Sequence, residues 1–169
     1  MGKFLSGRLV ALLFLVFCVT LEIVALYYQY QLEYYPCVMC IHARIIIALV
    51  IAALILQLLG YKFVWLRMSS RLVVVALCTW MVERGWQLLA TERGWNIGDC
   101  NMELGFPTWL AFDQWFPWMF KIHEPCGYTP YVLAEITMAE ILLVTWSLIL
   151  LTQLWALVYE FAGKQQTSD

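Results

Sequence analysis

The sequence predicts an all-α membrane protein with four transmembrane helices, on two observations. First, 63% of its 169 residues are hydrophobic and 13% are charged, which leaves too little polar surface to cover a water-soluble globule. Second, the apolar residues gather in four blocks of about 20 residues, the length at which a helix crosses the hydrocarbon layer of a bilayer. The four blocks are residues 9–28, 41–59, 72–90 and 137–159.

The first block could also be a signal peptide, because Lys3 and Arg8 precede it. It is long for that role, it ends in the aromatic and polar residues 27–30, and no small-residue cleavage site follows it. We therefore predict a spanning helix here.

The lysines and arginines beside the spans predict that both termini lie in the cytoplasm. In this orientation six of these cations face the cytoplasm and three face the outer side, in accordance with the positive-inside rule. Residues 29–40 and 91–136 are then outer loops, and residues 1–169 form a single membrane domain. The cytoplasmic cations are Lys3, Arg8, Lys62, Arg67, Arg71 and Lys164, and the outer ones are Arg44, Arg93 and Lys121.

Four cysteines lie in the two predicted outer loops. Cys37 and Cys40 form a C-x-x-C pair directly before the second span, whereas Cys100 and Cys126 lie in the longer loop. Thiols outside the cytoplasm are not kept reduced, so we expect these cysteines to form disulfides at least part of the time. Four cysteines allow three pairings, and the sequence does not choose among them.

The C-x-x-C pair has the sequence context of a redox-active dithiol. A pair at a helix start is close to the positive end of the helix dipole, which stabilises a thiolate. Arg44 follows Cys40 by four residues, one helical turn on and on the same face. Its guanidinium could favour a thiolate at Cys40 and bind a polar ligand at the membrane surface. The alternative is an interfacial anchor that extends to the lipid headgroups.

A metal site is the competing interpretation of these cysteines, and their spacing argues against it. Zinc sites of four cysteines use two close pairs, whereas Cys100 and Cys126 are 26 residues apart. A covalent haem needs a histidine directly after the second cysteine of a C-x-x-C pair, and His42 comes one position late. We therefore expect no metal, and we interpret His42 and His123 as interfacial polar residues.

The longer outer loop contains an aromatic stretch, residues 105–120, that is too short and too interrupted to span a membrane. Pro107 suits a helix start, and Trp109, Phe112 and Phe116 recur at near-helical spacing. We predict a short interfacial helix in this loop. This helix either has a purely structural role, holding the loop at the membrane surface, or keeps the two loop cysteines near the membrane.

Polar residues also occur inside the spans. Cys18 and Cys78 lie in the middle of the first and third spans, and we interpret them as packing residues. We assign Glu22 to packing within the protein and expect Arg84 to pair with an acid from another span, because intramembrane charges face protein or water rather than lipid.

These features together resemble the bacterial disulfide bond formation protein B family, DsbB. The C-V-M-C pair, Arg44, Cys100, Cys126 and the run F-P-T-W-L-A-F-D-Q-W-F-P carry the resemblance, which covers nearly the whole chain. It implies a four-helix bundle in the inner membrane of a Gram-negative bacterium, with the redox loops in the periplasm. It also implies an enzyme that reoxidises a periplasmic thiol oxidase, DsbA, and passes two electrons to a quinone, either ubiquinone or menaquinone. Its partners are then a DsbA-like protein, the quinone and lipid, and no nucleic acid.

The resemblance also implies a role for each residue. Cys100 forms the mixed disulfide with the reactive cysteine of the partner, and Cys126 is its pair. Cys37 and Cys40 reoxidise that pair through a transient bond between Cys37 and Cys126. Cys40 is the thiolate that faces the quinone, and Arg44 helps to bind or polarise the quinone.

The chain departs from the family pattern at two places. Many members have an acidic residue directly before the arginine, where this chain has Ala43. Some members have a histidine near the end of the third span, where this chain has Glu92 and Arg93. These differences leave the cysteines in place and concern the quinone pocket.

Two other functions are compatible with the cysteine pattern. A reductase of the vitamin K epoxide reductase type also couples loop cysteines to a C-x-x-C pair, but there the loop cysteines come first in the sequence. A tetraspanin-like scaffold would use the loop disulfides structurally, would keep them oxidised and would consume no quinone.

Overall fold

The computed structural model of the chain describes residues 2–95, 105, 111–123, 131–133 and 136–165. Its long helices are α1 (Gly2–Gln31), α2 (Val38–Leu59), α3 (Val64–Glu92) and α6 (Met138–Gln165). It also contains two single-turn helices, α4 (Phe112–Trp115) and α5 (Pro117–Phe120), and two short antiparallel strands, β1 (Tyr131–Leu133) and β2 (Ile136–Thr137).

The predicted fold class is confirmed: four helices of the described chain are long and apolar enough to cross a membrane. Three of the predicted blocks lie inside α1, α2 and α3, and the fourth begins one residue before α6. The strands β1 and β2 are an addition to the predicted all-α structure, in a segment rich in residues that favour β-structure. The division into a single domain stays a prediction.

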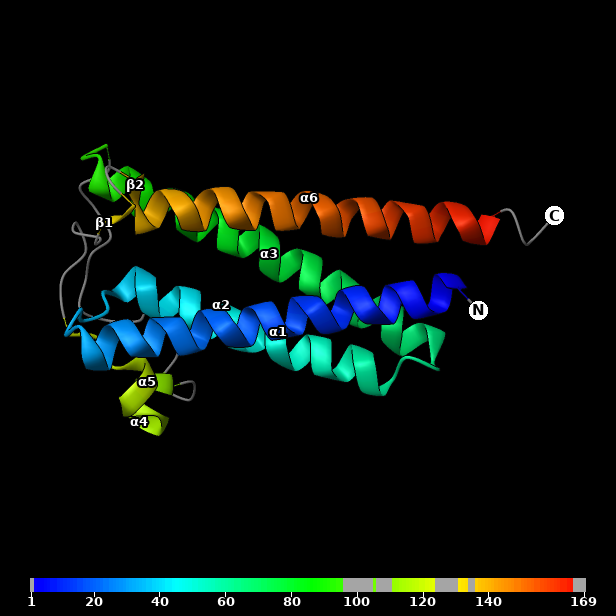
Figure 1. The fold of residues 1–169 in the computed structure, drawn as a ribbon, viewed down its shortest axis with the longest axis horizontal. Coiled ribbons are helices and arrows are strands. Elements are labelled where there is room, and N and C mark those ends of the chain that lie inside the picture. Colours follow the sequence, from blue (N-terminus) through cyan, green and yellow to red (C-terminus); the bar gives the residue numbers. More distant parts are fainter. Residues whose placement is uncertain (1, 96–104, 106–110, 124–130, 134–135, 166–169) are drawn as a thin grey trace.

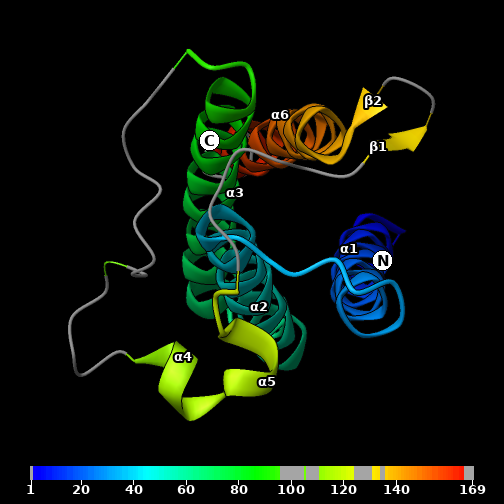
Figure 2. The same ribbon diagram turned by 90° about the vertical axis from the view of Figure 1, so that its left-hand side faces the viewer.

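The long helices lie side by side (Figure 1), with α2 packed against α1 and α3, and α3 packed against α6. The start of α1 and the end of α6 lie at one end of the bundle. The connection between α1 and α2, the turns α4 and α5, and the two strands lie at the other, which we call the loop end (Figures 1 and 2). Both predicted outer loops therefore meet at the same end of the bundle.

Each long helix contributes at least one fully buried side chain to an apolar core. Cys18, Val50, Cys78 and Trp146 are at most 1% exposed and belong to one hydrophobic cluster. The ring of Phe14 meets that of Trp146 edge to face, with centroids 6.2 Å apart, which joins α1 to α6. Both mid-span cysteines are thus buried among apolar side chains, as predicted for packing residues.

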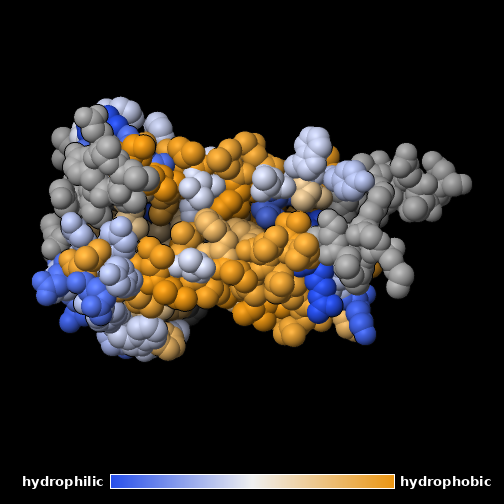
Figure 3. Space-filling model, viewed as in Figure 1, coloured by the Kyte–Doolittle hydropathy of each residue, from blue (hydrophilic) through white to orange (hydrophobic). Residues whose placement is uncertain are grey.

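Large apolar side chains also cover the outside of the bundle. Figure 3 shows hydrophobic residues over the middle of the molecule and hydrophilic residues gathered toward its two ends. Leu13 and Ile23 of α1 and Leu148 and Leu151 of α6 are among the exposed ones. Such a surface is unfavourable in water and suits the hydrocarbon layer of a bilayer. The chain is therefore a multi-pass membrane protein.

Two glycines allow close approaches between the helices. Gly60 ends α2, and a Cβ atom at this position would overlap the side chain of Leu66. Gly85 of α3 faces α6, and its Cβ would lie 3.0 Å from Leu142 Cδ2. The tight turn between α2 and α3 and the contact between α3 and α6 both use the missing side chain.

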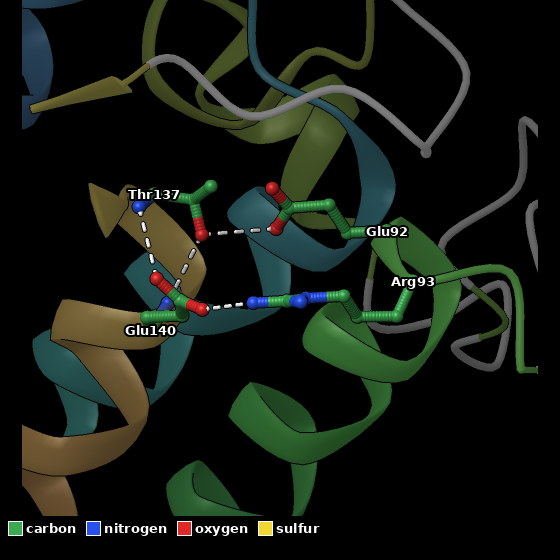
Figure 4. Close-up of polar contacts among 4 residues, drawn as sticks. All are labelled: Glu92, Arg93, Thr137 and Glu140. Carbon is green, nitrogen blue, oxygen red and sulfur yellow. Dashed lines mark hydrogen bonds and ion pairs between the residues drawn. The ribbon is translucent and has the colours of Figure 1, made fainter. Parts of the chain in front are cut away.

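A polar network joins the end of α3 to the start of α6 (Figure 4). Thr137 and Glu140 form a capping box: the Thr137 N–H donates to Glu140 Oε2 at 3.2 Å, and the Glu140 N–H donates to Thr137 Oγ1 at 3.4 Å. The Thr137 hydroxyl donates to Glu92 Oε2 at 3.2 Å, and Arg93 forms an ion pair with Glu140. Glu92 and Arg93, which depart from the family pattern, therefore contact α6.

Replacing Thr137 with alanine is expected to lower the free energy of unfolding by about 0.5–2 kcal/mol, because it removes the hydroxyl that caps α6 and contacts Glu92. Unfolding of the purified protein in detergent micelles measures this change. Thr152→Ala is the matched control, since the exposed Thr152 hydroxyl donates to the Ile149 carbonyl of its own helix and to no other group among the described residues. Equal destabilisation by the two variants would contradict the capping role.

Candidate functional site

Cys37 and Cys40 lie at the start of α2, at the loop end of the bundle. Cys37 is the N-cap residue, and its sulfur accepts a hydrogen bond from the Cys40 N–H at 3.4 Å. The two sulfur atoms are 2.9 Å apart and share a hydrogen bond. The first turn of the helix thus holds both sulfurs within reach of one another at its positive end, where a thiolate is stabilised.

The surroundings of this pair are apolar. Cys37 is 3% exposed and packs in a cluster with Met39, Leu88 and Ala139, while Cys40 is partly exposed and packs against the same cluster. The pair therefore lies where the start of α2, the end of α3 and the start of α6 meet. Low exposure protects a reactive sulfur from water, and the partial exposure of Cys40 leaves it the more accessible of the two.

Arg44 is buried one turn after Cys40, with 6% of its surface exposed. Its guanidinium donates to the side-chain carbonyl of Gln29, to the Ala25 carbonyl at 3.0 Å and to the Met119 carbonyl at 3.1 Å. The side chain is therefore bound between α1 and α5. These contacts contradict the alternative of an anchor that extends to the headgroups.

The charge of Arg44 acts on both thiols. Its guanidinium interacts electrostatically with Cys40 and, more weakly, with Cys37. A cation in a buried setting is screened less than one at a surface, so it favours negative charge on nearby sulfur. The geometry agrees with the predicted thiolate at Cys40, whose redox role stays a prediction.

Gln29 is a site residue that the sequence interpretation missed. It is 6% exposed, and it connects Arg44 to α5 because its amide also donates to the Trp118 carbonyl at 3.5 Å. The Tyr30 hydroxyl donates to the same carbonyl at 2.5 Å. A possible signal was the seven-residue spacing between Gln29 and Glu22, which places two polar residues on one face of an otherwise apolar helix.

Glu22 is buried toward Arg44, as expected of a residue that packs within the protein. It is 7% exposed, and neither carboxyl oxygen has a hydrogen-bond partner among the described residues. Its carboxyl group interacts electrostatically with the Arg44 guanidinium. The buried cation thus has a potential counter-charge on α1.

The prediction for Arg84 is wrong. In the described part of the chain it donates to Gln87 Oε1 at 3.0 Å and contacts no acid from another span. Gln87 also donates to Glu83 Oε1 at 2.9 Å. Residues three and four apart on one helix are neighbours, so these polar side chains satisfy one another along α3.

The predicted interfacial helix consists, in its described part, of the two turns α4 and α5 rather than one continuous helix. Phe116 separates them with φ −134° and ψ 66°, because the residue before Pro117 is disfavoured in the helical conformation. Phe120 is buried against Ile41 and Ile45 of α2. Pro107 and Trp109 lie outside the described residues, and a position along the membrane surface stays a prediction.

The second cysteine pair, Cys100 and Cys126, lies outside the described residues. The described segment that precedes Cys126 stops at His123, three residues before it. The His123 N–H donates to the Pro36 carbonyl at 3.3 Å, and its ring stacks on Tyr35 with centroids 5.2 Å apart. The chain that leads to Cys126 is therefore in contact with the residue directly before Cys37.

The two predicted interfacial histidines differ in exposure. His123 is exposed, as expected, but His42 is buried in α2 with 8% of its surface exposed. A pocket of about 420 Å³ lies between the end of α1 and the segment that includes His123. Gln29, Tyr30, Glu33, Tyr35, Pro117, Trp118 and His123 line it. Both outer segments contribute walls, so the pocket depends on their contact.

Comparison with known proteins finds relatives that carry the name disulfide bond formation protein B. That of Shewanella loihica (strain ATCC BAA-1088 / PV-4) is 29% identical over 146 residues, which cover 86% of this chain and 85% of the relative. The protein of Vibrio alginolyticus is 29% identical over 154 residues, which cover 85% of this chain and 88% of the relative. That of Aeromonas salmonicida (strain A449) is 30% identical over 125 residues, which cover 71% of this chain and 70% of the relative.

The match to a family model covers the bundle and both outer segments. The model described as disulfide bond formation protein DsbB matches residues 7–156, which run from the first turns of α1 to the last turns of α6. Because this match includes far more than half of the chain, the protein belongs to the DsbB family.

Proposed function

We propose that this protein is a quinone-dependent thiol oxidase that reoxidises a DsbA-like periplasmic protein and passes two electrons to ubiquinone or menaquinone. The observation that carries the proposal is the placement of the Cys37–Cys40 pair and the buried Arg44 on successive turns at the start of α2. Membership of the DsbB family supports disulfide formation as the chemistry. The quinone and the DsbA-like partner rest on the resemblance and on the chemistry of these residues.

The exchange begins at the longer loop. A thiolate of the reduced partner attacks Cys100 of a Cys100–Cys126 disulfide, and Cys126 leaves as a thiolate. Cys126 then attacks Cys37 of the Cys37–Cys40 disulfide, and Cys40 leaves. The second thiol of the partner resolves the mixed disulfide, and Cys100 leaves as a thiolate. Cys100 then attacks Cys126 of the Cys37–Cys126 disulfide, which re-forms the Cys100–Cys126 bond and releases Cys37. One partner dithiol has then become a disulfide, and the two electrons reside on the Cys37–Cys40 pair.

Arg44 is the residue that fits a quinone, and Gln29 orients it by accepting a hydrogen bond from the guanidinium. The guanidinium carries several N–H donors and is 6% exposed, and a quinone carbonyl oxygen accepts such hydrogen bonds. When bound, the quinone supplies the two-electron oxidation of the Cys37–Cys40 dithiol. Arg44 stabilises the thiolate that forms at Cys40, and the apolar cluster beside the pair limits the access of water.

The proposal includes a location for each end of the bundle. The loop end faces the periplasm of a bacterial inner membrane, and both termini face the cytoplasm. The distribution of lysine and arginine supports this orientation, because six of the nine cations beside the spans belong to the opposite end. The partner then reaches the loop cysteines from water, and the quinone approaches Arg44 from lipid.

The purified protein is expected to consume one quinone for each partner dithiol that it oxidises. The measurement mixes the protein in detergent with a reduced DsbA-like protein and a soluble ubiquinone or menaquinone analogue, and follows quinone absorbance together with free thiols. Turnover with one analogue and not the other identifies the acceptor. If the partner dithiol stays reduced and neither quinone is consumed, the proposal is wrong and the scaffold alternative gains support.

A further inference from the structure

We propose that Glu22 is a proton-binding residue linked to the redox state of the Cys37–Cys40 pair: it takes up a proton when the pair is reduced and releases it when the pair is oxidised. This inference rests on the proposed function. The observations behind it are the burial of Glu22, its electrostatic interaction with Arg44, and the lack of a hydrogen-bond donor to either carboxyl oxygen among the described residues.

One face of α1 brings Glu22 toward the Arg44 guanidinium. Glu22, Ala25 and Gln29 are spaced by three and four residues, so they follow one another along the same face of the helix. The guanidinium donates to the Ala25 carbonyl at 3.0 Å and to the side-chain carbonyl of Gln29. Arg44 is therefore bound to the turns of α1 that directly follow Glu22.

The charge of Glu22 depends on Arg44. A buried carboxylate that accepts no hydrogen bond is unfavourable unless a cation compensates its charge, and Arg44 is the cation that faces it from α2. Cys18, one turn earlier on α1, also interacts electrostatically with Glu22, and Cys78 of α3 interacts with Cys18. Both thiols are fully buried in the apolar core and have no part in the proposed relay.

Reduction of the Cys37–Cys40 pair places a second negative charge near the same cation. When disulfide exchange breaks the Cys37–Cys40 bond, Cys40 leaves as a thiolate, and Arg44 interacts electrostatically with Cys40 as well as with Glu22. One buried cation compensates only one of the two anions. Cys40 is partly exposed and lies at the positive end of α2, whereas Glu22 is buried inside α1 without a donor. We therefore expect the proton to bind to Glu22.

This proton is one of the two that the reduction of a quinone to a quinol consumes. When the pair is oxidised, the two sulfurs form a disulfide and give up two electrons. Cys37 loses the proton of its thiol, and Glu22 loses the proton of its carboxyl group. Both electrons and both protons go to the quinone, and Glu22 returns to the carboxylate that compensates Arg44. The next reduction of the pair restores the proton from water.

The test follows the protonation of Glu22 by infrared difference spectroscopy in the full chain, freed of quinone. The substitutions Cys100→Ser and Cys126→Ser leave the Cys37–Cys40 bond as the one that dithiothreitol reduces. Reduction is expected to produce the C=O band of a protonated carboxyl group, and reoxidation is expected to remove it. Glu22→Gln is expected to abolish this band. Glu22→Asp keeps a carboxyl group on a shorter side chain and is expected to shift the band.

Glu83→Gln is the matched control, because it makes the same change in another helix of the bundle. Glu83 is exposed and accepts a hydrogen bond from Gln87 at 2.9 Å, so its replacement is expected to leave the band unchanged.

A kinetic measurement uses the chain with all six cysteines. In Glu22→Gln, oxidation of one equivalent of the partner dithiol is expected to be retained. Reoxidation of the reduced Cys37–Cys40 pair by a soluble quinone analogue is expected to be slower by about 100-fold, because a positioned proton donor contributes about 10²–10⁴-fold to a rate.

The possible failures are distinguishable. If reduction of the Cys37–Cys40 pair produces no carboxyl band, or if the band persists unchanged in Glu22→Gln, the proton-binding role is wrong while the proposed function stands. If the chain with Glu22 in place neither oxidises the partner dithiol nor consumes quinone, the proposed function is wrong, and this inference with it.

Discussion

Replacing Cys40 with serine is expected to reduce quinone consumption to the uncatalysed background. Cys40 Sγ is 2.9 Å from Cys37 Sγ and interacts electrostatically with Arg44. In the proposed relay it is therefore both the disulfide partner of Cys37 and the thiolate beside the buried cation. A serine hydroxyl forms no disulfide and is not ionised at neutral pH. Quinone absorbance, followed with excess reduced partner, measures the loss.

The same variant separates the two halves of the relay. Cys100 and Cys126 are unchanged in Cys40→Ser, so the partner is still expected to form one mixed disulfide at Cys100, which is detectable on a non-reducing gel. Cys18→Ala is the control, because the Cys18 thiol is fully buried in the apolar core. It is expected to retain full turnover per folded molecule. Full turnover by Cys40→Ser would contradict the proposed route of the electrons.

The membrane helices and the position of the thiol pair at a helix start are the features that the sequence predicts well. A long apolar segment of this kind crosses a bilayer as a helix, because a helix satisfies its own backbone hydrogen bonds. The four-residue spacing of Cys40 and Arg44 fixes their relative placement on any helix. Both predictions depend only on local chain geometry, which explains their success.

Contacts between distant segments are harder to predict. Gln29 contacts Arg44 and Trp118 because α1, α2 and α5 pack together. The sequence around Gln29 does not indicate which distant residues it contacts. Arg84 shows the opposite case, in which a local partner, Gln87, replaces the distant acid that was expected. The three-residue spacing of Thr137 and Glu140 is typical of a capping box, and the sequence could have predicted this contact.

Gln29→Met is expected to raise the KM for quinone by about tenfold and to leave the KM for the partner dithiol unchanged. Methionine has a similar length but no hydrogen-bonding amide, so the buried Arg44 guanidinium loses an acceptor and turns toward its other partners. An unsatisfied buried polar group costs about 1–3 kcal/mol, and 1.4 kcal/mol corresponds to a tenfold change in an equilibrium constant. Steady-state kinetics with each substrate varied in turn measure the two KM values.

Two further variants show whether the effect passes through Arg44. Gln29→Glu retains an acceptor for the guanidinium but cannot donate to the Trp118 carbonyl when ionised, and it is expected to keep a KM for quinone near that of the unmodified protein. Tyr30→Phe removes the other hydrogen bond to Trp118 without changing Arg44. If Gln29→Met changes the KM for quinone no more than Tyr30→Phe does, then Gln29 does not orient Arg44. If the KM for quinone rises only in Gln29→Met, the side-chain carbonyl of Gln29 orients the Arg44 guanidinium. The hydrogen bonds that hold α5 against α1 then have no part in this effect.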